Sequence, residues 1–153
     1  MPIVELHVAG YRSIRDVRLR LQQVNVLVGP NGCGKSNLFR SMYLLTVAAN
    51  GRLARTLAEE GGMPSVLWAG ERNKGPVRLT LSVQLDQLGF ELSCGLPRPA
   101  CSAFTLDPEV KEEKVWFREG KKQTTLLERD HALVKARDAD GQKVMFPSTP
   151  RQS

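Results

Sequence analysis

The sequence predicts an α/β fold of α+β character, with a strand–loop–helix unit near the N-terminus and a subdomain of antiparallel strands after it. The first observation is a glycine-rich octapeptide at residues 29–36, which stands between an apolar, β-branched run and a helical pattern. The second is a series of alternating apolar and polar segments between residues 77 and 147, joined by short connections. Short connections favour hairpins over βαβ repeats, so this second part is expected to be antiparallel.

Two alternating segments, at residues 3–8 and 16–21, predict the first strands. In the second segment Val17, Leu19 and Leu21 fall on one face and arginines fall on the other. The bend at residues 10–14 joins them, which predicts a hairpin-like pair ahead of the octapeptide. Residues 24–28 read Val-Asn-Val-Leu-Val and predict a further strand that leads into it.

The octapeptide satisfies the pattern G-x-x-x-x-G-K-[ST] of a phosphate-binding loop, or Walker A motif. Its residues are Gly29, Pro30, Asn31, Gly32, Cys33, Gly34, Lys35 and Ser36. A helix is expected to begin near Lys35, because apolar residues follow at helical spacing at positions 38, 39, 42, 45 and 49. Strand, loop and helix in this order predict a P-loop NTPase, which binds a nucleoside triphosphate with Mg²⁺.

Each part of the octapeptide has a physical role in this prediction. Glycines adopt positive φ with little strain, so backbone N–H groups can curl around an anion at the positive end of the helix. Lys35 is the expected catalytic residue because it would reach the β- and γ-phosphates, and the Ser36 hydroxyl is the expected Mg²⁺ ligand. Cys33 is either a small residue that the loop tolerates or a redox-sensitive thiol at a helix N-terminus.

Length and composition narrow the class of protein. A chain of 153 residues is one domain or a part of one. Three widely spaced cysteines favour neither a disulfide framework nor a zinc site. The sequence shows neither a secretory signal nor a transmembrane run, so we expect a cytoplasmic protein without membrane contact.

The net charge of +6 is concentrated near the octapeptide. Residues 1–55 carry eight basic and two acidic side chains, whereas the remaining residues carry 14 of each. Such a basic excess attracts polyanions, either a nucleotide or DNA. The alternative is a solvated basic face without a partner.

We divide the chain into a partial domain at residues 1–147 and a polar tail at residues 148–153. Residues 1–50 hold the first strands, the octapeptide and the first helix, and residues 51–76 hold a short helix at 52–60, with an Arg55–Glu59 pair, and a loop. Residues 77–147 hold antiparallel strands, with a hairpin turn at Asp140 and Gly141. These strands are expected at residues 77–85, 90–96, 114–118, 124–128, 132–137 and 143–146.

The arrangement resembles the first lobe of ABC-type ATPase heads, and within them the RecF-like, chromosome-maintenance and OLD-type group of AAA family ATPases. The residues that carry the resemblance are Gly-Tyr-Arg-Ser-Ile at 10–14 and Val-Gly-Pro-Asn-Gly-Cys-Gly-Lys-Ser-Asn at 28–37, with weaker similarity at 52–60 and 64–70. The resemblance implies that the nucleotide is ATP and that Arg12, Ser13 and Asn37 lie beside it. It also implies a head-to-head homodimer in the complete protein, with ATP hydrolysis coupled to DNA repair or to defence against foreign DNA.

Several elements of a complete head are missing from the sequence. No run of four apolar residues ends in an acidic pair, so there is no Walker B motif. Residues 91–95 superficially match the family's signature motif, but they fall within an expected strand. Gln84 and Gln87 are candidates, by position alone, for the glutamine that joins Mg²⁺ to the attacking water. We therefore expect this chain alone to bind nucleotide weakly and to hydrolyse it slowly or not at all.

Two further hypotheses stay open at this point. One is a non-hydrolysing, nucleotide-gated module that binds DNA or a partner chain. The other is a truncated product without activity of its own.

Overall fold

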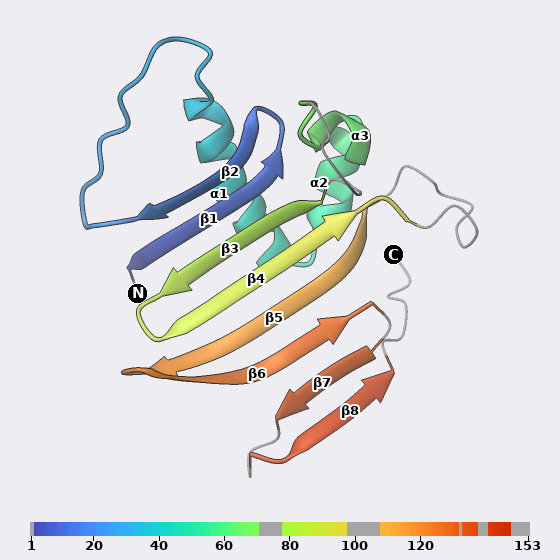
Figure 1. Cartoon of the computed structure of the whole chain (residues 1–153). Helices are drawn as coiled ribbons and strands as arrows, with labels where there is room; N and C mark the ends of the chain where they lie inside the picture. Colours follow the sequence, from blue (N-terminus) through green and yellow to red (C-terminus); the bar gives the residue numbers. More distant parts are fainter. Residues whose placement is uncertain (1, 71–77, 98–107, 132, 138–140, 148–153) are drawn as a thin grey trace.

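The computed structural model describes residues 2–70, 78–97, 108–131, 133–137 and 141–147. These residues form a single eight-stranded antiparallel sheet in the order β2-β1-β3-β4-β5-β6-β7-β8. Figure 1 shows the strands running side by side, with the helices on one face near the N-terminal end of the sheet. The strands are β1 (Ile3–Tyr11), β2 (Ile14–Arg20), β3 (Leu79–Leu85), β4 (Leu88–Gly95), β5 (Glu109–Glu119), β6 (Lys122–Asp130), β7 (Leu133–Arg137) and β8 (Lys143–Pro147).

The N-terminal hairpin is part of the same sheet as the later strands. β1 pairs with β2 on one side, with Val8 opposite Val17, and with β3 on the other, with Val8 opposite Leu81. The predicted hairpin and the predicted antiparallel series are therefore confirmed as strands, and they share one continuous hydrogen-bonded sheet. The fold is mostly antiparallel sheet with few helices, so the α/β class that we predicted fits it only in part.

Three helices follow the hairpin along the chain. They are α1 (Lys35–Ala49), α2 (Leu53–Glu59) and α3 (Met63–Val66). α1 begins at the predicted residue and ends before Gly51, whose φ of 70° is typical of the residue that stops a helix. The predicted pair between Arg55 and Glu59 lies on the exposed side of α2, with 3.0 Å between Nε and Oε1.

The core lies between the sheet and these helices. Alternate residues of the strands, such as Leu6 and Leu81, are buried against Leu44 of α1 and Leu57 of α2. Each large apolar side chain buried in this way contributes about 1.5–3 kcal/mol of transfer free energy. This layer fixes α1 on the sheet and thereby places the start of α1, where the octapeptide ends.

The prediction of a strand at residues 24–28 is wrong. This segment lies in none of the described strands, and Figure 1 shows it as part of the long blue connection that swings away from the sheet. Val24, Val26 and Val28 are 79%, 80% and 90% exposed. An apolar run of this kind is typical of a strand with neighbours on both sides, and the described residues offer it no neighbouring strand.

The expectation for residues 91–95 has an outcome in the structure. Residues 91–95, which superficially match the family's signature motif, lie within β4. The expectation that this segment is part of a strand is confirmed. The expected hairpin turn includes Asp140, which lies outside the described residues. Among the residues that the structure describes, none of the helices has the length and apolar character needed to cross a membrane.

Candidate functional site

The predicted phosphate loop, residues 29–36, leads directly into α1. Gly32 and Gly34 have φ of 82° and 100°, which a residue with a side chain adopts only with strain. The helix is opened by a hydrogen bond from the Leu38 N–H to the Gly34 carbonyl at 3.0 Å. No side chain caps the N-terminus of α1, and its first turn contains no acidic residue. The first N–H groups of the helix are therefore left without a side-chain acceptor at its positive end.

A hollow of about 240 Å³ lies at this helix start. Six of the seven residues around it come from the loop and the first turn of α1, and one comes from the turn between β1 and β2. They are Ser13, Asn31, Gly32, Gly34, Lys35, Ser36 and Asn37. The structure thus brings most of the predicted site residues around one space.

Lys35 is folded over its own loop. Its ammonium donates hydrogen bonds to the carbonyls of Gly29 and Pro30 at 2.6 and 2.8 Å, and the sulfur of Cys33 lies 3.6 Å away. A side chain at Gly29 would put a Cβ atom 2.7 Å from that sulfur, so the Cys33 side chain would have to move to make room for it. The result is one positive charge held at the rim of the hollow by neutral acceptors, which an anion would outcompete.

Ser13 is the part of the β1–β2 turn that reaches the loop. Its hydroxyl oxygen accepts a hydrogen bond from Asn37 Nδ2 at 2.8 Å. A Cβ atom on Gly34 would come within 3.0 Å of the same oxygen. Gly34 therefore allows the turn to pack closely on the helix start, in addition to supplying the left-handed backbone.

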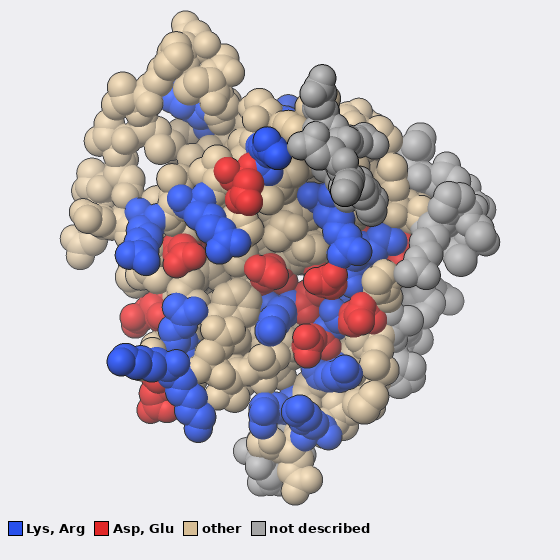
Figure 2. Space-filling view, in the orientation of Figure 1, with Lys and Arg blue, Asp and Glu red and all other residues tan. Residues whose placement is uncertain are grey.

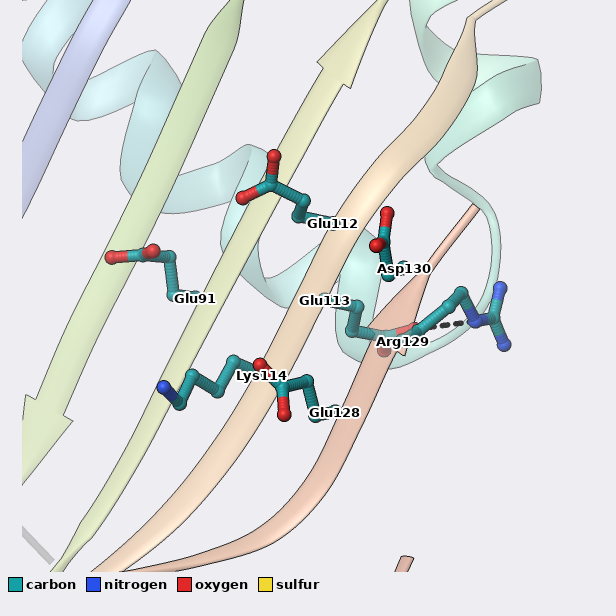
Figure 3. A pocket seen from close by; sticks show the side chains of 7 residues that line it. All are labelled: Glu91, Glu112, Glu113, Lys114, Glu128, Arg129 and Asp130. Carbon is teal, nitrogen blue, oxygen red and sulfur yellow. Dashed lines mark ion pairs between the residues drawn. The ribbon is translucent and has the colours of Figure 1, made fainter. Parts of the chain in front are cut away.

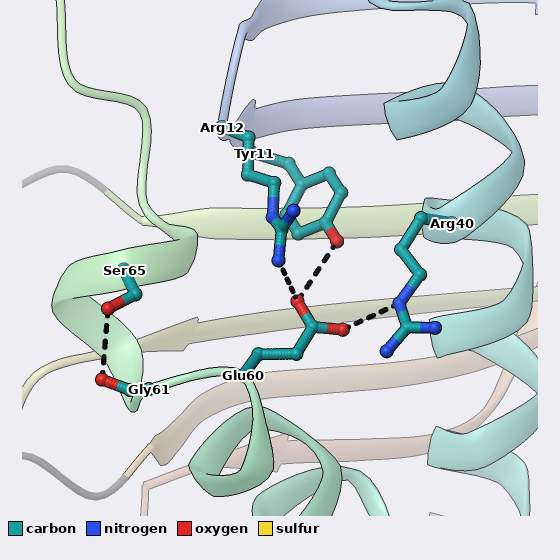
Figure 4. Close-up of polar contacts among 6 residues, drawn as sticks. All are labelled: Tyr11, Arg12, Arg40, Glu60, Gly61 and Ser65. Carbon is teal, nitrogen blue, oxygen red and sulfur yellow. Dashed lines mark hydrogen bonds and ion pairs between the residues drawn. The ribbon is translucent and has the colours of Figure 1, made fainter.

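Arg12 does not line the hollow, although it precedes Ser13. Its Nη2 atom donates to Oε2 of Glu60 at 2.7 Å, and Arg40 Nε donates to Oε1 of the same carboxylate at 2.7 Å. The hydroxyl of Tyr11 is a third donor, at 3.3 Å. Figure 4 shows the three donors converging on Glu60 from separate elements. Sequence reasoning missed Glu60, since contacts 20, 48 and 49 residues apart leave no periodic signal.

Burial and charge shift two pKa values in this cluster. Burial first, and then the nearby Glu60 carboxylate, raise the pKa of Tyr11 to about 12. The hydrogen bond from Arg40 to Glu60 raises the pKa of that guanidinium above its usual value. Tyr11 is therefore a neutral donor and Arg40 a fixed positive charge at any physiological pH.

The glutamine candidates lie elsewhere. Gln84 accepts a hydrogen bond from the indole N–H of Trp116 at 2.9 Å and donates to the carbonyl of Leu85 at 2.8 Å. The carbonyl of Gln87 accepts from the N–H of Arg118 at 2.6 Å in the β3–β4 connection. Neither glutamine lines the hollow at the loop, and Gln84 has a packing role on the sheet.

A second hollow, of about 250 Å³, lies over β4, β5 and β6. Figure 3 shows the five carboxylates and two basic side chains that surround it, with one ion pair between Arg129 and Glu113. An excess of carboxylates repels phosphate, so this hollow is not a nucleotide site. Figure 2 shows the face of the sheet turned to the viewer with acidic and basic side chains interspersed, as is typical of a solvated surface.

One family model and several curated proteins match this chain. The model of the AAA ATPase domain family matches residues 1–112. The DNA replication and repair protein RecF of Citrifermentans bemidjiense is 31% identical over 93 residues, which are 58% of this chain and 25% of that protein. RecF of Geobacter sp. (strain M21) is 32% identical over 92 residues, with the same shares of the two chains. RecF of Chlamydia trachomatis serovar L2 is 30% identical over 94 residues, or 60% of this chain and 26% of that protein.

The chain spans about a quarter of the length of the curated relatives that it matches. The family model covers most of the chain, from the first strand through the loop and the helices into β5. The predicted resemblance to RecF-like ATPases is confirmed by these matches. The chain belongs to the AAA ATPase domain family.

Proposed function

We propose that this chain binds ATP, with the triphosphate in the hollow at the start of α1, as the N-terminal part of an ABC-type AAA family ATPase. The observation that carries the proposal is the Lys35 ammonium, held on loop carbonyls beside an uncapped helix N-terminus. A positive side chain and free backbone donors at one point are what a phosphate group requires.

Different residues of the loop would bind different parts of the triphosphate and its Mg²⁺. Lys35 would exchange the carbonyls of Gly29 and Pro30 for oxygens of the β- and γ-phosphates. Backbone N–H groups of the glycine-rich turn and of the first turn of α1 would cradle the remaining phosphate oxygens. Ser36, an exposed residue at the rim of the hollow, would offer its hydroxyl to Mg²⁺, which supplies charge neutralisation when bound.

Three side chains next to the loop complete the proposed site. Ser13 and Asn37 would fix the wall of the hollow through their hydrogen bond, and Asn31 would border its open side. Arg12 would act from behind Ser13, where its guanidinium adds positive charge near the phosphates. We further propose that the complete protein forms a head-to-head dimer around ATP. Hydrolysis of the ATP would serve DNA repair, in line with the role named for the RecF relatives, or defence against foreign DNA.

A second candidate function is a nucleotide-gated DNA-binding module that does not hydrolyse ATP. The observation that favours it is a pair of exposed arginines, Arg18 and Arg20, on β2 at the edge of the sheet. Fluorescence anisotropy with a DNA duplex at about 50 and 200 mM salt tests it, because counterion release makes phosphate contacts salt-dependent. Binding that weakens with salt and is lost in Arg18→Ala/Arg20→Ala supports the module. Binding that persists in that double variant contradicts it.

Titration calorimetry with ATP and Mg²⁺ tests the leading proposal. Lys35→Ala should lower the affinity at least tenfold, since a hydrogen bond to a charged group contributes roughly 1.5–3 kcal/mol. Lys122→Ala is the matched control, because it removes one exposed lysine from β6, outside the lining of the hollow. Equal affinity of the Lys35 variant and the wild type would overturn the proposed site.

A further inference from the structure

We infer that Glu60 is a positioning residue of the nucleotide site, holding the β1–β2 turn (residues 12 and 13) against the start of α1. The inference rests on the proposed function, which concerns the loop itself. It begins from the burial of the Glu60 side chain, only 5% of which is exposed, and from its three donors. One carboxylate oxygen accepts from Arg12 and Tyr11, and the other accepts from Arg40.

The place of Glu60 at the C-terminal end of α2 is electrostatically unfavourable for a carboxylate. It is the C-cap residue of α2, where the negative end of the helix dipole repels a carboxylate. A buried carboxylate at such a place requires strong partners, and the two guanidinium groups provide them. The arrangement therefore couples Glu60 to the arginines more tightly than a surface ion pair would.

The turn that Glu60 holds is strained. Arg12 has φ of 48°, in the left-handed region that a residue with a side chain rarely adopts. Two contacts to the segment after α2 hold it there: its N–H donates to the carbonyl of Val66 at 2.8 Å, and its guanidinium donates to Glu60. Strain of this kind persists only where neighbouring contacts enforce it.

The second arginine ties the same carboxylate to α1. Arg40 is in the second turn of that helix, five residues after Lys35. Glu60 thus joins the two walls of the hollow: the turn that carries Ser13 and the helix that carries Lys35 and Asn37. Without its charge, the two guanidinium groups would share only a neutral acceptor, and the turn that carries Ser13 would be held less firmly on the loop.

The chain offers a matched pair of variants for the test. Glu60→Gln removes the charge and keeps the shape of the side chain. Glu59→Gln removes the neighbouring charge, which belongs to the exposed pair with Arg55. ATP affinity is measured by titration calorimetry for both variants, and urea unfolding shows the fraction of folded chain under the same conditions. If Glu60→Gln does not fold, Glu60→Asp, which keeps the charge and shortens the side chain, replaces it.

We expect Glu60→Gln to weaken ATP binding about tenfold while the chain stays folded, and Glu59→Gln to change it less than twofold. In a Ser13→Ala background the effect of Glu60→Gln should shrink to less than twofold, because the residue acts through the turn. A purely structural role would instead lower stability and leave the affinity of the folded chain unchanged in both backgrounds.

Three results would overturn the inference. Wild-type affinity in folded Glu60→Gln would do so, and so would tighter binding, which would mean that Glu60 competes with phosphate for Arg12. Equal effects in the wild-type and Ser13→Ala backgrounds would also contradict it. If the wild type binds ATP and Lys35→Ala does not, these results overturn the role of Glu60 alone. A wild type that binds no ATP overturns the proposed function as well.

Discussion

Asn37 donates a hydrogen bond from Nδ2 to the hydroxyl oxygen of Ser13 at 2.8 Å, across 24 residues of sequence. The contact joins the turn of the first hairpin to the first turn of α1, and both residues border the hollow at the loop. This hydrogen bond therefore joins the two walls of the proposed ATP site, which come from segments far apart in the sequence.

Asn37→Ala should lower ATP affinity by a factor of about two to ten. A hydrogen bond of this kind contributes roughly 0.5–1.5 kcal/mol, and its loss would free the turn from the helix start. Titration calorimetry with ATP and Mg²⁺ measures the change. Asn50→Ala is the control, because Asn50 lies at the other end of α1. Its Nδ2 atom also donates a hydrogen bond, to the backbone carbonyl of Thr46 at 2.9 Å. Equal affinities of the two variants would contradict the role of this contact.

ATP should protect Cys33 from alkylation. Cys33 is exposed and lies beside the Lys35 ammonium, whereas Cys94 is buried, and burial raises the pKa of its thiol to about 12. In a Cys101→Ser background, mass spectrometry after iodoacetamide treatment should find label on Cys33 and not on Cys94. Saturating ATP should slow the labelling several-fold.

The control for this experiment is Lys35→Ala in the same background, where ATP should protect little. Protection that is as strong in that variant as in the parent would show that the nucleotide shields Cys33 by some route other than the loop.

Gly10→Ala should destabilise the fold severely. Gly10 has φ of 70°, and a Cβ atom there would lie 2.0 Å from the backbone carbonyl oxygen of Arg78. Because backbone must move to remove this clash, we expect a loss of at least about 3 kcal/mol in the free energy of unfolding. Urea denaturation followed by circular dichroism measures it.

Gly120→Ala is the matched variant for Gly10→Ala. Gly120 also has positive φ, at 58°, but a Cβ atom there would meet nothing within 4 Å. Gly120→Ala should lower the free energy of unfolding by roughly 1–2 kcal/mol, because it adds only the strain of a left-handed backbone. Losses of similar size at the two glycines would show that the contact with Arg78 does not matter.

Tyr11 should make stability fall at high pH. Its pKa is about 12 in the native chain against 10.0 for an unperturbed tyrosine. Between these values the unfolded chain has lost the phenolic proton while the native chain keeps it, so the free energy of unfolding decreases as pH rises. The contribution is fully present below about pH 10 and falls by up to about 1.4 kcal/mol per pH unit until pH 12.

Urea unfolding at several pH values between about 9 and 12 checks this dependence. Tyr11→Phe should show a shallower decline over this window, since phenylalanine has no proton to lose. Parallel curves for the wild type and the variant would contradict the raised pKa of Tyr11.

Much of the sheet could be predicted because its cause is local. Apolar and polar side chains alternate within each segment of β1, β2 and the later strands, so the pattern can be recognised segment by segment. Hairpins then join strands that are neighbours in sequence. The start of α1 was equally accessible, since Gly34 can adopt φ of 100° ahead of a helical pattern. The candidate site at residues 29–36 followed from the motif, whose residues are contiguous.

The errors arise where the outcome depends on distant partners. The run at residues 24–28 has strong strand propensity, but a strand exists only where another pairs with it. Phe39 matches the helical spacing of the core residues and yet is 61% exposed, because spacing alone does not tell which face of α1 will be covered. Glu60 gave no local signal, as its partners come from β1, the β1–β2 turn and α1.

The exposed run at residues 24–28 also has a consequence for the behaviour of the chain in solution. It combines high β-propensity with neither charge nor proline, and its backbone is outside the sheet. These are the properties of segments that recruit one another into intermolecular β-structure. Aggregation of the isolated chain at high concentration should therefore start at this run, and a lysine in place of Val26 should suppress it without disturbing the core.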